Sequence, residues 1–232
     1  MFPIRDTIPH QRPPVTTIAL IVVNLLAFWG ELKLAPSEQQ QFFEVFGLIP
    51  ARFTNPAWAA SVGLWPSWVP WFTTMFLHGG WLHLLGNMWF MWIFGDNVED
   101  RMGHMGFLVF YLVCGLAASA THVALSPHSH MPTIGASGAI AGILGAYFLL
   151  FPGARVLTLV PIFIFIRFIE IPAFIFLGFW FVMQFYSGAM SGVGANATGV
   201  AFWAHVGGFV AGLLLLALFV RRGSRRTPVF GI

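Results

Sequence analysis

The sequence predicts an all-α membrane protein: a bundle of six transmembrane helices with both termini on the cytoplasmic side. Of its 232 residues, 58% are hydrophobic and only 8% are charged, whereas about a quarter of a soluble domain is charged. The basic residues, which give a net charge of +3, sit beside apolar segments rather than along a polar face. This placement indicates a lipid bilayer and no nucleic-acid partner. The length suits one compact bundle without a second soluble domain.

Six segments are apolar and long enough to cross a bilayer, whose core of about 30 Å takes roughly 20 helical residues. They cover residues 16–34, 72–94, 104–125, 132–151, 171–190 and 199–220. A further apolar stretch, 156–166, is short and interrupted by Pro161. We interpret it as an interfacial approach to the fifth span.

The distribution of basic residues predicts the orientation of these spans. With both termini inside, only Lys33 and Arg52 lie outside, and the other nine basic residues lie inside. The expected organisation is therefore a cytoplasmic tail (1–15), a membrane domain (16–220) and a basic cytoplasmic tail (221–232).

Two outer loops and the N-terminus add further expectations. The loop over 35–71 carries four tryptophans, which favour the headgroup region, so we expect it to lie partly in the outer leaflet. The loop over 187–198 consists almost entirely of small residues and is expected to be mobile. No cleavable signal peptide or organelle-targeting extension precedes the first span, so a bacterial-type plasma membrane is the expected location.

Four polar side chains stand out within the spans, where polar groups are costly and usually functional. They are His83 and Asn87 in span two, Ser137 in span four and His205 in span six. Ser137 and His205 each lie about five to six residues below the outer end of their span, or roughly 8–10 Å at 1.5 Å per residue. The shared depth predicts that the two side chains can meet.

Glycines at matching positions offer the means of contact between spans four and six. Gly138 and Gly142 are four residues apart, as are Gly208 and Gly212. Small residues at this spacing let two helix backbones approach closely in lipid. His205 shares a helix face with the second pair, so we expect this face to pack beside Ser137.

Each polar residue also has a purely structural explanation: Ser137 as a packing residue, His205 as a hydrogen-bonding group, and His83 with Asn87 as a tie between helices. Their combination favours nucleophilic catalysis, because a neutral histidine can take the proton of a serine hydroxyl. Spans four and six contain no acidic residue, so a Ser–His dyad is expected. Asn87, His83 and the backbone N–H of Ser137 are the candidate oxyanion donors.

Other membrane functions fit less well. There is no HExxH motif for a zinc protease. Asp96, at an inner end, is the only aspartate in a span, which argues against an aspartyl intramembrane protease. His128 and His130 lie in an outer loop, where solvated side chains are expected rather than a metal site. A transporter would need a polar path across the whole bilayer, and the inner halves of the spans carry few polar side chains. Neither a metal nor a cofactor is expected.

Four motifs carry a resemblance to a known family. They are FLHGGWLHLLGN (76–87), VEDRMG (98–103), GASGA (135–139) and AHVGGFVAG (204–212). In this order, the sequence resembles the rhomboid family of intramembrane serine proteases over roughly residues 70–220. The resemblance implies a six-helix protease that cleaves single-span membrane proteins near the outer leaflet, with span five and the last outer loop as the substrate gate.

By position, the resemblance implies that Ser137 is the nucleophile and His205 the general base. It places His83 and Asn87 as oxyanion partners, with Gly135 lining the same pocket, and matches Glu99 and Gly103 to a structural motif. Two features depart from some members: a Trp-Arg pair is absent from the first loop, and Ala141 stands where a tyrosine stacks on the histidine. The alternative function is a catalytically silent relative that binds and escorts membrane proteins. The oligomeric state does not follow from the sequence.

Overall fold

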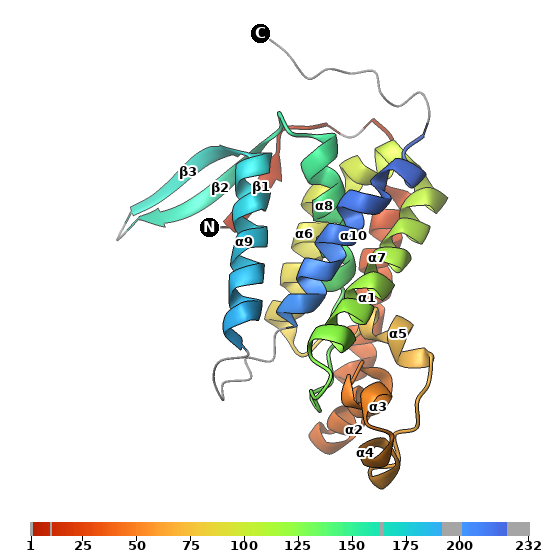
Figure 1. Cartoon of the computed structure of the whole chain (residues 1–232). Coiled ribbons are helices and arrows are strands. Elements are labelled where there is room, and N and C mark those ends of the chain that lie inside the picture. The colour runs from red at the N-terminus through yellow and green to blue at the C-terminus, as the bar shows by residue number, and fades with distance from the viewer. Residues whose placement is uncertain (1, 10, 163–164, 192–200, 222–232) are drawn as a thin grey trace.

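The structure, a computed structural model, describes residues 2–9, 11–162, 165–191 and 201–221. Long helices form a bundle, short helices gather at one end of it, and a three-stranded sheet lies beside the opposite half (Figure 1). In chain order the elements are β1 (Phe2–Asp6), α1 (Val15–Glu31), α2 (Pro36–Phe46), α3 (Ala51–Thr54), α4 (Pro56–Ser61), α5 (Val69–Thr73), the 3-10 turn η1 (Thr74–Phe76), α6 (Trp81–Met102), α7 (His104–Leu125), α8 (Ser137–Leu150), β2 (Arg155–Ile162), β3 (Phe165–Pro172), α9 (Ala173–Ser191) and α10 (Phe202–Phe219).

The long helices are those of an integral membrane protein. Within the described residues, α7, α10 and α9 as far as Met190 are long and apolar enough to cross a membrane, and α1 and α8 are shorter apolar helices. Their outward faces are apolar too: Leu214 and Leu218 on α10 are 74% and 77% exposed. Such helices are solvated by lipid. The helical membrane fold is confirmed, but the prediction that the protein is all-α is wrong, because β1, β2 and β3 form a sheet. The count of six spans and their orientation stay predictions.

Helix α10 packs against α8 and α7 at the centre of the bundle. A methyl group added at Gly208 would overlap the carbonyl oxygen of Gly138, and one at Gly212 would overlap that of Gly142. The predicted glycine contact between these two helices is therefore confirmed. It brings the first turns of α8 and α10 together, because both helices begin at the same end of the bundle (Figure 1).

Two predicted spans have the wrong boundaries. The span predicted over 72–94 is interrupted after η1, and α6 begins only at Trp81 and continues to Met102. Gly80, with φ +156°, ends the extended connection that precedes α6. The span predicted over 132–151 becomes helical only at Ser137, after Gly135 with φ +126°. Positive φ values suit glycine and end regular helix.

Residues 156–166, interpreted from the sequence as an interfacial approach to the fifth span, form most of β2 and the start of β3. Their position relative to the membrane stays a prediction. The sheet order is β1-β2-β3 with antiparallel pairing, in which Phe2 lies opposite Leu159 and Arg155 opposite Pro172. The strands are rich in β-branched and aromatic residues, which favour extended structure. The N-terminal tail thus supplies a strand, and Trp89 of α6 donates a hydrogen bond to the Pro3 carbonyl at 2.6 Å.

The loop expected over 35–71 folds into α2 to α5, which lie together at one end of the bundle (Figure 1). Buried Arg52 holds this region by donating hydrogen bonds to the carbonyls of Val45 and Trp65, at 2.9 and 2.8 Å. In the last outer loop, expected over 187–198, residues 187–191 continue α9, and the rest lies outside the described residues. The expected basic tail lies outside them as well, apart from residue 221.

Candidate active site

A cavity of about 490 Å³ opens between the first turns of α6, α8 and α10, at the end of the bundle that carries α2 to α5. Its lining is mostly apolar, with a few convergent polar groups, as is typical of a binding site. The residues predicted to act together all line it: His83, Asn87, Gly135, Ser137 and His205.

Ser137 is the first residue of α8 and is half-buried against the cavity. The chain reaches it through Gly135, whose N–H donates to the Thr74 carbonyl at 2.8 Å. A methyl group at Gly135 would stand only 2.6 Å from Nε2 of His83. Only glycine therefore allows this backbone to pass so close to the histidine ring. The backbone N–H of Ser137 lies in the first turn of α8, where amide groups lack intrahelical partners.

His205 lies in the first turn of α10, directly opposite Ser137. Its Nε2 is 2.7 Å from Ser137 Oγ, although 68 residues separate the two in the sequence. This is a normal hydrogen-bond distance. The structure therefore brings together the two residues that the sequence singled out as nucleophile and base.

His83 and Asn87 are one turn apart on α6 and face the same cavity. The Gly79 N–H points at Nδ1 of His83 across a long 3.4 Å contact. With Nδ1 accepting, the ring proton lies on Nε2, on the side of Gly135. Asn87 is 8% exposed, and its amide nitrogen has no hydrogen-bond partner within the part of the chain that the structure describes. Asn87 thus presents an N–H group without a partner among the described residues, and the Nε2–H of His83 lies beside Gly135 at the same cavity.

Sequence reasoning missed two residues of α9 that contact His205. Gln184 Oε1 lies 2.7 Å from Nδ1 of His205, and the ring of Trp180 lies against the imidazole with 5.8 Å between centroids. A polar side chain in the middle of an apolar span was the signal that could have singled out Gln184.

His122 on α7 was also missed. It is 8% exposed, and its Nδ1 has no partner among the described residues. Its neighbour Ser119, one turn earlier on the same helix, lines the cavity. A histidine within an apolar helix was the corresponding signal in the sequence.

The described residues contain no group of three or more His, Cys, Asp or Glu side chains placed to hold a metal ion. Of the two loop histidines weighed as a metal site, His130 stacks on Trp58 with 4.4 Å between ring centroids. The polar side chains that line the cavity itself carry hydroxyls, two imidazoles and an amide.

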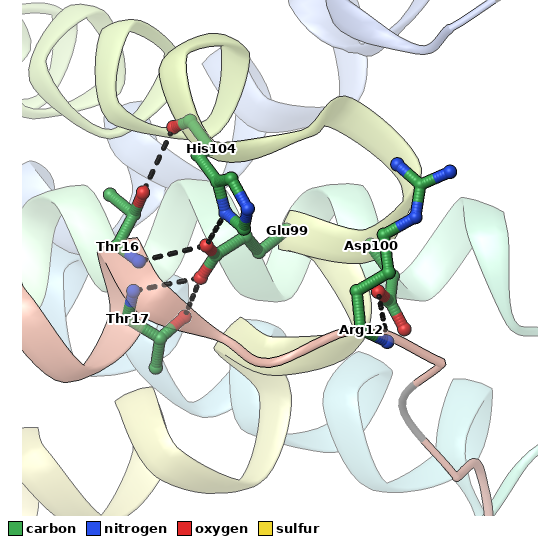
Figure 2. A network of polar contacts seen from close by, with 6 residues as sticks. All are labelled: Arg12, Thr16, Thr17, Glu99, Asp100 and His104. Atoms are coloured by element: carbon green, nitrogen blue, oxygen red, sulfur yellow. Dashed lines mark hydrogen bonds and ion pairs between the residues drawn. The ribbon is translucent and has the colours of Figure 1, made fainter.

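Glu99 and Gly103 lie at the opposite end of α6, far from the cavity. Figure 2 shows the Glu99 carboxylate between the first turn of α1 and His104. It accepts hydrogen bonds from the N–H groups of Thr16 and Thr17, both at 2.8 Å, and contacts His104 Nδ1 at 2.6 Å. Gly103, with φ +74°, makes the sharp turn between α6 and α7. This contact set is structural and holds α1 against α6 and α7.

Comparison with known proteins agrees with this geometry. The Rhomboid domain model matches residues 66–222. The chain is 42% identical over 74 residues to the Rhomboid protease GluP of Bacillus subtilis, covering 32% of this chain and 14% of that protein. It is 36% identical over 78 residues to the chloroplastic Rhomboid-like protein 11 of Arabidopsis thaliana, covering 34% and 28%. The mitochondrial Rhomboid protein 1 of Saccharomyces cerevisiae is 29% identical over 150 residues, covering 60% and 38%.

The matched segments span well under half the length of these relatives, so the similarity concerns the membrane core rather than the whole of each relative. The domain model, in contrast, covers more than half of this chain and includes every residue of the cavity named above. The chain therefore belongs to the rhomboid family.

Proposed function

We propose that this protein is an intramembrane serine endopeptidase that uses Ser137 and His205 as a catalytic dyad. The observation that carries the proposal is the 2.7 Å contact between Ser137 Oγ and His205 Nε2, inside a cavity of an apolar helical bundle. A serine hydroxyl is a weak nucleophile until a neighbouring base accepts its proton. The pair therefore has the geometry and the chemistry needed to cleave a peptide bond.

In the proposed reaction, the proton of Ser137 Oγ moves to Nε2 of His205 as Oγ attacks the carbonyl carbon of the substrate. The C–N bond then breaks, and the imidazolium returns its proton to the leaving amine. This leaves an acyl group on Ser137. A water molecule, deprotonated by His205, attacks the ester and releases the second product, with Ser137 restored.

The negative charge on the carbonyl oxygen needs donors that are already in place. Asn87 supplies its amide nitrogen, which has no partner in the described part of the chain, His83 its Nε2–H, and Ser137 its backbone N–H. The N-terminus of α8, where Ser137 lies, adds the positive end of a helix dipole. Gly135 keeps the space next to these donors open.

The substrate class follows from where the cavity lies. With six spans and both termini inside, as the basic residues predict, the cavity lies at the outer end of the bundle. We propose that it receives the outer part of a single-span membrane protein, in a bacterial-type plasma membrane. The proposal also includes the boundaries that the sequence predicts for the two cytoplasmic tails, the membrane domain and the loops.

The first test is cleavage of a model single-span substrate by the purified protein in liposomes, comparing wild type with Ser137→Ala and His205→Ala. We expect each variant to lose at least about 10³-fold in kcat/KM, because the two residues act as a unit. The substitutions change no packing at the glycine contact, so thermal stability should stay within a few degrees of wild type. A serine-directed fluorophosphonate probe should label wild type at Ser137.

Retained cleavage in the Ser137→Ala variant would overturn the dyad. Absence of both cleavage and labelling in wild type would instead favour the binding and escort function. In that case, co-purification of single-span proteins without their cleavage is the expected observation.

A further inference from the structure

The second ring nitrogen of His205, Nδ1, has a polar partner outside the Ser–His dyad. Nε2 faces Ser137, while Nδ1 points away from the cavity toward α9, where Gln184 Oε1 lies at 2.7 Å. A histidine can accept the serine proton at Nε2 only when Nε2 is unprotonated. The contact at Nδ1 decides whether this condition holds.

The carbonyl oxygen of an amide can only accept a hydrogen bond. Because Gln184 Oε1 is the atom that faces His205, the proton must lie on Nδ1. The neutral ring then keeps a lone pair on Nε2, and the hydroxyl of Ser137 donates to it. In Ser–His–Asp enzymes a carboxylate holds the histidine in this tautomer. Here a neutral amide occupies the corresponding position, which avoids burying a charge within an apolar bundle.

The imidazole is also held from its face. Trp180 lies one turn before Gln184 on α9, and its ring packs against His205 with an interplanar angle of 35°. Ala141 of α8 is buried and carries only a methyl group, so it supplies no ring to pack on the imidazole. The aromatic contact to His205 comes from α9 instead.

We propose that Gln184 is a positioning residue that sets the tautomer of His205, with Trp180 restricting the orientation of its ring. The proposal rests on the proposed protease function for its catalytic consequence, but the tautomer itself is a property of the resting protein. Both contacts come from α9, so the base is correctly prepared only while α9 packs against α10. A movement of α9 away from α10 would withdraw both contacts at once.

The direct test is the protonation state of the imidazole at neutral pH, measured by NMR on protein with ¹⁵N-labelled histidine, with the His205→Ala variant assigning the signal. In wild type we expect the proton on Nδ1. In Gln184→Met, which keeps the side-chain length but removes the acceptor, we expect the Nε2–H form to become the major one. Gln184→Glu keeps an oxygen at this position and should restore the Nδ1–H form.

The second readout is the kinetics of cleavage. We expect Gln184→Met to lower kcat by about 10- to 100-fold, as loss of one buried hydrogen bond predicts, with KM within about twofold of wild type. Gln184→Glu should recover most of kcat. The matched control is Met183→Leu: this neighbouring side chain is 42% exposed on the outer face of α9 and lies outside the site, so both readouts should stay unchanged.

The two hypotheses fail in different ways. An Nε2–H ring in wild type, or the same tautomer in wild type and Gln184→Met, would overturn the role of Gln184 whether or not the protein cleaves. An Nδ1–H ring that changes in Gln184→Met, in a protein that cleaves nothing, would uphold the positioning role and count against the protease function.

Discussion

Polar side chains at the two ends of α6 differ in their hydrogen bonding. At one end, Glu99 accepts hydrogen bonds from both threonines of α1 and from His104, so its carboxylate is saturated (Figure 2). At the other end, Asn87 keeps a buried amide nitrogen without a partner in the described part of the chain, beside a cavity of about 490 Å³. The same helix therefore carries a fully paired polar group and an unpaired one.

This difference separates groups that stabilise the fold from groups that are available for chemistry. A buried polar group that has its partners contributes to stability, whereas an unpaired one has a cost in free energy. An oxyanion site has to tolerate this cost, because donors that were already satisfied in the resting protein could not bind a developing charge. Variants at the two ends should therefore change different measured quantities.

The largest stability effect is expected at the saturated end. In Glu99→Gln, an NH₂ group replaces one of the oxygens that now accept from N–H and O–H donors. At least one of these donors then faces another donor instead of an acceptor. We expect the free energy of unfolding to fall by about 2–4 kcal/mol, measured by thermal or denaturant unfolding in detergent.

The control for this change is Asp100→Asn at the next position. Asp100 also accepts hydrogen bonds from backbone N–H groups near the N-terminus (Figure 2), but these contacts are exposed, so a loss below about 1 kcal/mol is expected. Equal losses in the two variants would show that burial of the Glu99 contacts adds nothing.

A substitution at the Asn87 end of α6 should lower activity rather than stability. We expect Asn87→Ala to lower kcat by about 10²- to 10³-fold, as for removal of an oxyanion donor. The free energy of unfolding should change by less than about 1 kcal/mol, because the amide nitrogen has no hydrogen-bond partner among the described residues. Both quantities are measured on the same purified sample.

A second asparagine of α6 provides the matched comparison. Asn97 donates to Asp6 Oδ2 at 2.8 Å and is fully enclosed. Asn97→Ala should lower stability by about 1 kcal/mol and leave kcat unchanged. If Asn97→Ala lowered kcat as much as Asn87→Ala does, the two ends would not be functionally distinct.

A pH-dependent effect on stability is expected at Asp6, which joins β1 to α6 and α8. Burial raises the pKa of this carboxyl to about 6, although hydrogen bonds from Tyr147 and Asn97 act in the opposite direction. Because the folded state holds the proton more tightly than the unfolded state, its contribution is fully present below about pH 4 and is lost as the pH rises to about 6.

We therefore expect a shift of a few degrees in the unfolding midpoint of wild type across this range. The variant Asp6→Asn, which cannot ionise, should lack the part of the shift that belongs to Asp6. Melting curves between pH 4 and pH 7 measure both proteins, and identical pH dependence in the two would exclude Asp6 as the source.

Local and periodic features of the sequence determined the class of protein and the residues of interest. The apolar composition and long apolar segments indicated a helical membrane protein, and glycine spacing indicated the contact of α8 with α10. Rare polar residues in apolar spans singled out Ser137, His205, His83 and Asn87. These features depend on residue type and short-range spacing, and both are visible without a structure.

Only the tertiary structure decided which side chains meet across the bundle. Gln184 was not assigned to His205, residues 156–166 were not recognised as strands, and Gly135 was not seen to make space for His83. The physical reason is that helices solvated by lipid are apolar on all faces, so no amphipathic pattern shows which face turns inward. The partner of a side chain then depends on helix rotation and depth, which are set by packing between segments distant in the sequence.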